Sequence, residues 1–182
     1  MKLDITITQL INSLSGRSAV ADQFFILTTK YGVPLIVLAV IFQWWGKRPR
    51  VEWRQTTVIA GLTFLIGLLI AQIILLFIHR IRPYDAGVSH LIIDKTIDWS
   101  FPSDHAIASL SIAFAFLLNG FRRHALAFFC AALLVCFSRI FVGMHYASDI
   151  LGGAGVALVT AYLVNKFYPR GSKLDFWLVS WF

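Results

Sequence analysis

The sequence TTVIAGLTFLIGLLIAQIILLFI, residues 56–78, runs for 23 positions without a charged side chain. A helix needs about 20 apolar residues to cross the hydrocarbon core of a bilayer, so this run predicts a transmembrane helix. The rest of the chain fits that class, because 58% of the 182 residues are hydrophobic and only 14% are charged. Such a composition leaves too little polar surface for a soluble domain of this size. We therefore expect one integral membrane domain that covers residues 1–182.

Shorter apolar runs predict the remaining spans. They occupy residues 32–45, 106–121, 125–138 and 150–165. Each of them reaches spanning length only by including polar neighbours at its ends. The segment 1–17 and the tail 175–182 are typical of helices that lie on the membrane surface. The predicted fold class is all-α: a polytopic transmembrane helical bundle with about five to six spans plus interfacial helices.

The charges divide unevenly between the two sides of the membrane. Loops on one side hold nine basic and two acidic residues, whereas loops on the other side hold seven of each. Loops rich in Lys and Arg stay in the cytoplasm, so the balanced side is predicted to face outward or into the periplasm. The net charge of +7 does not indicate a nucleic-acid partner, because the basic residues are scattered in short loops.

Three polar clusters that are far apart in the sequence fall on the balanced side. They are Arg80 with Arg82-Pro83, Phe101-Pro102-Ser103-Asp104-His105, and Ser138-Arg139 with His145 and Asp149. Ionisable groups inside a membrane span are costly, so their presence marks a functional site. We expect the three clusters to meet at the outward ends of the helices.

The residue types in these clusters predict a phosphate site. His145 and Asp149 are one helical turn apart, so the carboxylate can hold one imidazole nitrogen and leave the other as a nucleophile. Arg82 and Arg139 present forked donors that match phosphate oxygens. Ser103 lies at a predicted helix N-terminus, where free backbone N–H groups favour an anion.

Each feature also has a plainer interpretation. A His-x3-Asp pair is usually a satisfied polar contact, a serine after proline is usually only an N-cap, and Arg82-Pro83 is commonly a turn. Their coincidence on one side favours a catalytic site, in which His105 is the acid for a leaving oxygen. Two alternatives remain. One is a metal-dependent hydrolase with His105, His145 and Asp149 as ligands, and the other is a lipid transporter or structural protein with an inactive site.

The three clusters resemble the three-part signature of the type 2 phosphatidic acid phosphatase superfamily. The matching residues are Arg82-Pro83, Pro102-Ser103-x-His105 and Ser138-Arg139-x5-His145-x3-Asp149. The resemblance covers about residues 56–166 of the sequence. It implies a helical bundle whose site lies at one membrane face.

The resemblance also implies a role for each residue of the signature. His145 would attack phosphorus and form a phosphohistidine, Asp149 would orient it, and His105 would protonate the leaving group. The phosphoryl oxygens would be held by Arg82, Ser103 and Arg139. The transfer would depend on positioning and charge, with no metal or cofactor.

Two positions depart from the family pattern. The lysine that normally stands seven residues before Arg82 is replaced by Leu75, which removes a phosphate cation. Arg80 is the best-placed substitute, and anchoring among lipid headgroups is its alternative role. Asp104 stands where the family usually has glycine, as in undecaprenyl pyrophosphate phosphatases of the bacitracin-resistance type. A carboxylate beside His105 favours the protonated, acid-competent imidazole.

These observations predict a membrane lipid phosphatase. The resemblance implies hydrolysis of undecaprenyl or another polyprenyl pyrophosphate to the monophosphate and inorganic phosphate, at the outward face of the cell membrane. A phosphatase for phosphatidylglycerophosphate, phosphatidate or lipid A is the alternative. The expected partners are the lipid substrate and the bilayer.

Overall fold

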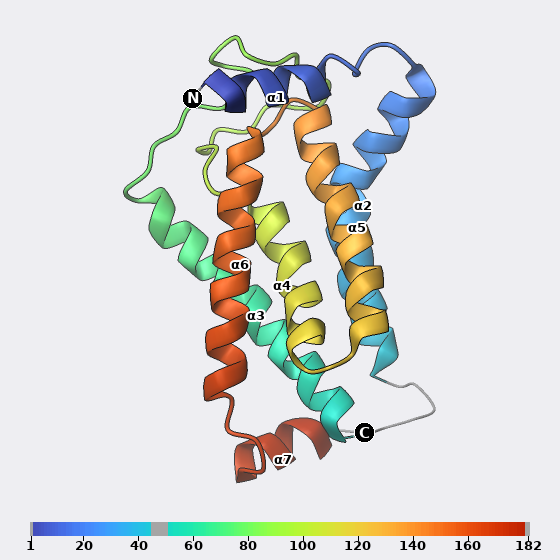
Figure 1. Cartoon of the computed structure of the whole chain (residues 1–182), viewed down its shortest axis with the longest axis vertical. Helices are drawn as coiled ribbons and strands as arrows, with labels where there is room; N and C mark the ends of the chain where they lie inside the picture. Colours follow the sequence, from blue (N-terminus) through green and yellow to red (C-terminus); the bar gives the residue numbers. More distant parts are fainter. Residues whose placement is uncertain (1, 45–50, 181–182) are drawn as a thin grey trace.

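A computed structural model describes residues 2–44 and 51–180 of the chain (Figure 1). Within these residues the chain forms seven helices and no strand, which confirms the predicted all-α class. The helices are α1 (Lys2–Asn12), α2 (Ala19–Gln43), α3 (Val51–Leu75), α4 (Asp104–Leu118), α5 (Arg122–Phe141), α6 (Ala147–Phe167) and α7 (Lys173–Ser180).

Among the described residues, four helices are long and apolar enough to cross a membrane, namely α2, α3, α5 and α6. The remaining predicted span is α4, an apolar helix of only 15 residues. Helix α1 lies across one end of the bundle and α7 lies across the other (Figure 1), as expected for interfacial helices. The end of the predicted tail helix, Trp181 and Phe182, lies outside the described residues.

The boundaries of α3 differ from the uncharged run that predicted it. The helix begins earlier, at Val51, and ends at Leu75, before the apolar run is complete. Leu76 and Phe77 are strongly exposed and belong to a turn. Hydrophobicity therefore marked the presence of this span but not its ends, because the residues that leave the helix are as apolar as those inside it.

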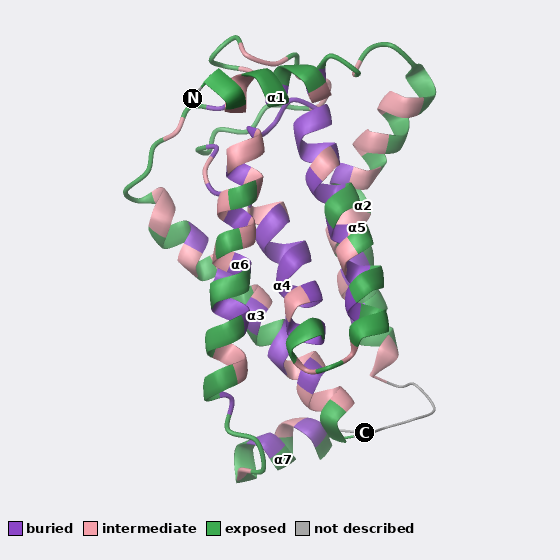
Figure 2. Ribbon diagram, in the orientation of Figure 1, coloured by how far each residue is buried: buried purple, intermediate pink, exposed green. Residues whose placement is uncertain are grey.

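Helix α4 occupies the centre of the bundle and is enclosed by α3, α5 and α6 (Figure 2). Ten of its residues are buried. Near its C-terminal end Phe116 is fully buried and packs in a cluster with Ile59 of α3 and Phe128 of α5. A helix shorter than the bilayer is tolerated here because other helices surround it in place of lipid.

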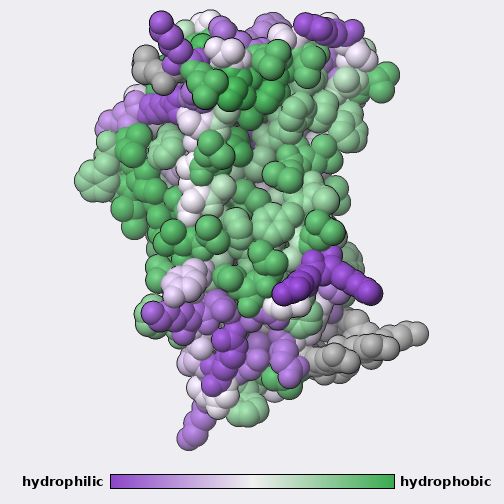
Figure 3. Space-filling model, in the orientation of Figure 1, coloured by the Kyte–Doolittle hydropathy of each residue, from purple (hydrophilic) through white to green (hydrophobic). Residues whose placement is uncertain are grey.

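The outer surface carries a hydrophobic belt between two hydrophilic ends (Figure 3). Leu65 of α3, Leu133 of α5 and Leu151 of α6 are 62%, 62% and 73% exposed. Such a belt would favour aggregation in water, but it matches the hydrocarbon core of a bilayer. The chain is thus a multi-pass membrane protein.

Helices α4 and α6 cross closely at Gly153. A Cβ atom at this position would lie 2.8 Å from the carbonyl oxygen of Ser103 and 2.9 Å from the Cβ of Ala106. Backbone atoms cannot move aside as a flexible side chain can, so the crossing requires glycine. It brings the start of α4 against the first turns of α6, where the Ser103 N–H donates to the carbonyl oxygen of Asp149 at 3.2 Å.

The segment 76–103 joins α3 to α4 without a helix and lies at the α1 end of the molecule (Figure 1). Asn12 of α1 donates to the His90 carbonyl oxygen at 2.9 Å and accepts from the His90 N–H at 2.7 Å. Gly143, between α5 and α6, has a φ of +89°, and a Cβ there would overlap the same carbonyl oxygen. Helix α1, the segment 76–103 and the connection between α5 and α6, which are distant in sequence, therefore pack together at this end.

Candidate active site

The three polar clusters predicted from the sequence meet at the α1 end of the bundle. A pocket of about 120 Å³ lies between them. Its lining includes Arg82, Pro102, Asp104, His105, Arg139 and His145. The signature residues are therefore neighbours in space, as the sequence predicted.

His145 directs one ring nitrogen into this pocket. The side chain is almost fully buried, and its Nδ1 lies 2.9 Å from the carbonyl oxygen of Ser100. A carbonyl oxygen can only accept a hydrogen bond, so Nδ1 carries the hydrogen. The other nitrogen, Nε2, carries the lone pair and accepts a long hydrogen bond of 3.4 Å from Nη1 of Arg82. This is the state that a nucleophile requires.

The contact between Asp149 and the imidazole of His145 is longer than the i, i+4 spacing of the two residues predicted. His145 precedes α6, and its Nδ1 is 3.5 Å from Asp149 Oδ2, farther than from the Ser100 carbonyl oxygen. The same Oδ2 accepts from the Ser100 hydroxyl at 2.5 Å and from the Tyr146 N–H at 2.8 Å. Asp149 therefore fixes the segment whose carbonyl oxygen binds His145, in addition to lying beside the imidazole itself.

Arg82 is locked in place by three acceptors. Its Nη1 donates to the Met144 carbonyl oxygen at 2.9 Å, Nε donates to the Asp98 carbonyl oxygen at 3.1 Å, and Nη2 pairs with Asp98 Oδ1 at 3.0 Å. The guanidinium is buried at the pocket wall. A fixed cation beside His145 Nε2 suits an anionic substrate.

Two buried donors in this region have no hydrogen-bond partner within the described residues: Ser103 Oγ and Arg139 Nε. Ser103 is the N-cap residue of α4, yet its hydroxyl makes no capping bond, contrary to the plainer interpretation of this serine. A buried donor without a partner costs about 1–3 kcal/mol. A phosphoryl group in the pocket would supply an acceptor for Arg139, which lines it.

His105 and Asp104 begin α4 and line the same pocket. Both also line a second groove of about 330 Å³ between α2, α3 and α4, so they stand where the two spaces adjoin. Asp104 Oδ1 is buried and has no hydrogen-bond partner in the described part of the chain. This position suits a group that exchanges a proton with a leaving oxygen.

Arg80 is not brought to the pocket. Its Nη1 donates to Ser148 Oγ and to Asp149 Oδ1, each at 2.6 Å, and its Nη2 pairs with Asp4 Oδ2 at 2.6 Å. The guanidinium also lies over the Tyr146 ring, 3.8 Å from its centroid. The structure thus gives Arg80 protein partners on the far side of Asp149, in place of the phosphate partner that the sequence suggested.

Leu75, which replaces the usual lysine, does line the pocket. Three further residues of the site belong to no motif of the sequence: Ser100, Asp4 and Asp98. Ser100 is fully buried and touches both His145 and Asp149, but a lone serine in a loop gives no pattern to detect. Asp4 lies far from the signature in the sequence, and only its charge in an otherwise uncharged part of α1 could have signalled a partner.

Burial sets the protonation of His145. It lowers the pKa of His145 to about 4, against an ordinary value of 6.5, so the imidazole is neutral at pH 7. Burial raises the pKa of Asp98, but a hydrogen bond with Thr96 and the charge of Arg82 outweigh it and lower the pKa overall. Asp98 therefore stays ionised beside Arg82.

The alternative hypothesis of a metal-dependent hydrolase is not supported by a ligand set in the described residues. No group of three or more His, Cys, Asp or Glu side chains there is arranged to hold a metal ion. Asp149 instead accepts hydrogen bonds from Ser100 and Arg80.

A sequence profile of the PAP2 superfamily matches residues 56–173, more than half of the chain. The chain belongs to the PAP2 superfamily. The undecaprenyl-diphosphatase BcrC of Bacillus subtilis (strain 168) is 32% identical to this PAP2 protein over 166 residues, which covers 91% of this chain and 84% of that one. Membership and this similarity identify the PAP2 protein as a membrane lipid phosphatase.

Solved structures show the same fold. The crystal structure of Aquifex aeolicus LpxE superposes with a TM-score of 0.72 at 22% identity, and covers 91% of this chain and 96% of that one. A PAP2-type phosphatidylglycerolphosphate phosphatase from Bacillus subtilis gives a TM-score of 0.64 at 20% identity, over 94% and 87% of the two chains.

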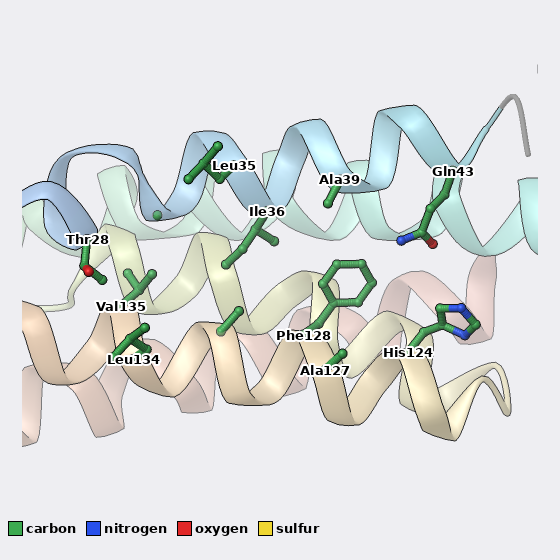
Figure 4. Close-up of a pocket in the computed structure, with 12 residues that line it drawn as sticks. Thr28, Leu35, Ile36, Ala39, Gln43, His124, Ala127, Phe128, Leu134 and Val135 are labelled. Atoms are coloured by element: carbon green, nitrogen blue, oxygen red, sulfur yellow. The ribbon is translucent and has the colours of Figure 1, made fainter. Parts of the chain in front are cut away.

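A larger apolar groove of about 460 Å³ lies between α2 and α5 of the PAP2 protein (Figure 4). It runs from Thr28 and Val135 to Gln43 and His124 at the other end of the helices. It shares no lining residue with the catalytic pocket. Its apolar walls suit lipid chains, but the chemistry of the site lies elsewhere.

Proposed function

We propose that this PAP2 protein hydrolyses undecaprenyl pyrophosphate, or a closely related polyprenyl pyrophosphate, to the monophosphate and inorganic phosphate. The observation that supports it most is the buried Nε of Arg139, which has no hydrogen-bond partner in the described residues and belongs to a residue that lines the same pocket as His145. The hydroxyl of Ser103, also buried without a partner there, lies between the lining residues Pro102 and Asp104 in the sequence. The name of its Bacillus subtilis relative supports the choice of lipid.

In the first proposed step, His145 Nε2 attacks the terminal phosphorus. An N–P bond forms while the P–O bond to the lipid monophosphate breaks, and the leaving oxygen takes the electron pair and a proton from His105. Arg82, Arg139 and Ser103 hold the equatorial oxygens, where charge accumulates. No metal is needed for this charge stabilisation.

In the second step, water attacks the phosphohistidine. His105, now neutral, takes a proton from the water, the N–P bond breaks, and its electron pair returns to His145. Inorganic phosphate leaves the pocket. The position of His105 between the pocket and the adjoining groove allows it to meet both the leaving lipid and the entering water.

The groove beside His105 gives the lipid a place. Val33 of α2 and Phe64 and Leu68 of α3 line its apolar part, and Lys30 stands among the lining residues with His105. A polyprenyl chain would lie against the apolar part, and its head would reach the pocket. Lys30 would then meet the phosphate that remains on the lipid, where Leu75 offers no charge.

This role for Lys30 predicts a defect that depends on the substrate. Lys30→Ala should raise KM about tenfold for a pyrophosphate lipid, in line with the loss of a charged hydrogen bond, and less for a monophosphate lipid. The matched control is Lys95→Ala, since Lys95 pairs with Asp85 and lines neither space. Equal KM values for Lys30→Ala and the wild type on both lipids would contradict the role.

The loop charges support an active site that faces outward or into the periplasm, because the opposite side carries nine basic against two acidic residues. We place the protein in the cell membrane on this basis. A product released there would be a lipid carrier available for reuse.

Purified protein in detergent provides the direct test. We expect phosphate release from undecaprenyl pyrophosphate to exceed release from phosphatidylglycerophosphate, phosphatidate and lipid A by at least about tenfold in kcat/KM. Vanadate should inhibit, since it can adopt five-coordinate geometry on His145, and EDTA should leave the rate unchanged. Preference for another lipid would overturn the substrate, and loss of activity in EDTA that zinc restores would overturn the mechanism.

A further inference from the structure

On helix α1 one set of polar side chains faces the protein, and several large apolar side chains face outward. Asp4, Thr8 and Asn12 recur every fourth residue, so they share one face, and Thr8 and Asn12 are buried. Leu3 and Leu10, by contrast, are 73% and 68% exposed. A helix at the end of a transmembrane bundle with this polarity suits the lipid interface on its outer face. Its inner face is left for hydrogen bonds.

That inner face binds the start of α6. The Thr8 hydroxyl accepts from the Ala147 N–H at 3.1 Å. Asp4 Oδ1 accepts from the Ser148 N–H at 2.9 Å, and its Oδ2 accepts from the Ser148 hydroxyl at 2.7 Å. Asp4 thus caps the N-terminus of the helix that carries Asp149.

Arg80 connects this contact to the buried carboxylate of the site. It bridges Asp4 Oδ2 and Asp149 Oδ1, with 2.6 Å on each side. The other oxygen of Asp149 is the one that holds Ser100 and lies beside His145. A continuous set of contacts therefore runs from the interfacial helix to the nucleophile.

We propose that Asp4 and Arg80 are positioning residues: together they fix the carboxylate of Asp149, and through it the imidazole of His145. This role replaces the phosphate-binding role considered for Arg80. It rests on the proposed function only in that His145 is the nucleophile, and it does not depend on which lipid is the substrate.

The two roles of Arg80 predict different kinetics. A residue that binds phosphate affects KM, and its loss is greater for a diphosphate than for a monophosphate. A residue that positions the nucleophile affects the chemical step on every substrate, and a small displacement can cost about a hundredfold. Only the positioning role makes Asp4, which does not line the pocket, matter as much as Arg80.

Asp4→Asn and Arg80→Gln provide the test: the first removes the charge and keeps the shape of the side chain, and the second removes the charge and shortens the side chain. We expect each to lower kcat and the single-turnover rate of phosphohistidine formation about tenfold or more, with KM within twofold of wild type. The double variant should lose little beyond either single variant, because both act through one contact. Asp4→Glu should recover part of the rate.

Asp85→Asn is the matched control, because Asp85 lies on the same side of the membrane and, among the described residues, pairs with Lys95 alone. Thermal unfolding in detergent would identify misfolded variants. If either variant misfolds, Ser148→Ala replaces it, because this change removes one hydrogen bond from Asp4 and one from Arg80. The expected loss in kcat is then smaller. Wild-type kcat in Asp4→Asn, or a raised KM in Arg80→Gln, overturns the proposal. A wild-type protein that releases no phosphate from any lipid contradicts the proposed function instead.

Discussion

At the scale of single residues, the chemistry depends on which nitrogen of His145 faces the pocket. The Ser100 carbonyl oxygen fixes the hydrogen on Nδ1, and the lone pair of Nε2 remains beside Arg82. This arrangement requires no proton transfer before the attack on phosphorus. It also makes the imidazole hard to replace, since another side chain would have to reach the same point in the pocket and also bind the Ser100 carbonyl oxygen.

The first prediction follows from that geometry. His145→Ala should reduce kcat below about a hundredth of wild type, because the other imidazole that lines the pocket, His105, acts as the acid in the proposed mechanism. His105→Ala should lose about 10²- to 10⁴-fold on natural lipids, the usual worth of acid–base catalysis, and less on substrates with good leaving groups. Phosphate release by both variants, matched for folding by thermal unfolding, provides the measurement. Activity of His145→Ala above that level would mean a different nucleophile.

A second prediction concerns pH. Because burial lowers the pKa of His145 to about 4, the neutral nucleophile persists as the pH falls and is lost only near that value. A histidine with an ordinary pKa of 6.5 would instead lose about tenfold between pH 7.5 and pH 5.5. We expect kcat/KM for a substrate with a good leaving group, which needs no acid, to change less than twofold over this range. A fall in kcat/KM at acid pH with a midpoint near 6.5 would show that His145 is more exposed to water than in this structure.

Sequence spacing located the side chains that face substrate but not those behind them. Arg82, Ser103 and His145 belong to short motifs whose residue types are typical of phosphate binding and nucleophilic attack. We could therefore predict from the sequence that these motifs come together in one site. Arg80 and Asp4 could not be assigned in the same way, because a charged side chain reaches several possible partners and only the folded chain selects among them. For Arg80, proximity to Arg82 in sequence suggested the pocket, whereas its side chain points to the opposite side of Asp149.

At the scale of elements, the site depends on how closely α6 approaches α4. Gly153 permits the contact with Ser103, which places the start of α4 beside Asp149. The presence and class of the helices followed from hydropathy, but this crossing did not. A glycine in a transmembrane helix is common, and its neighbours become known only in three dimensions.

Gly153→Ala should therefore impair both stability and activity. The added methyl group meets backbone at 2.8 Å, so we expect a loss of about 1–3 kcal/mol in stability and a displaced Ser103. Gly155→Ala is the matched control on the same helix, because no atom lies within 4 Å of its added Cβ. Thermal unfolding in detergent and phosphate release would be compared for the two. Equal behaviour would show that the crossing tolerates a larger separation.

At the scale of the whole molecule, the two ends of the bundle are distinct. Helix α1 and the segment 76–103 lie at one end, and α7 lies at the other (Figure 1). Arg82, Thr96 and Asp98 of that segment line the pocket. The sequence predicted which loops lie together at each end, because successive transmembrane helices place successive loops on alternate sides of the membrane. The direction of the bundle in the membrane rests on loop charges alone.

Cysteine labelling provides a test of that direction. Single cysteines introduced as Ala86→Cys and Ser172→Cys, with Cys130→Ala and Cys136→Ala as background, should react from opposite sides of the membrane. In intact cells, an impermeant maleimide should label only Ala86→Cys, since its loop is on the side with balanced charge. Lysed cells show that both thiols can react. Labelling of Ser172→Cys in intact cells would place the chemistry in the cytoplasm.

The contacts of α1 also bear on how the protein matures. Ribosomes make this helix before the other described helices, but part of its polar face binds residues made much later: the Ser148 N–H that Asp4 binds is 144 positions further along the chain. Asn12 and Asp4 can bind His90 and Arg80 before α6 is made, whereas the contacts of Thr8 with Ala147 and of Asp4 with Ser148 form only once α6 has been translated and inserted. The cluster of His145, Arg80 and Asp149 is therefore completed only with α6, so we expect a nascent or truncated chain that lacks α6 to show no hydrolysis.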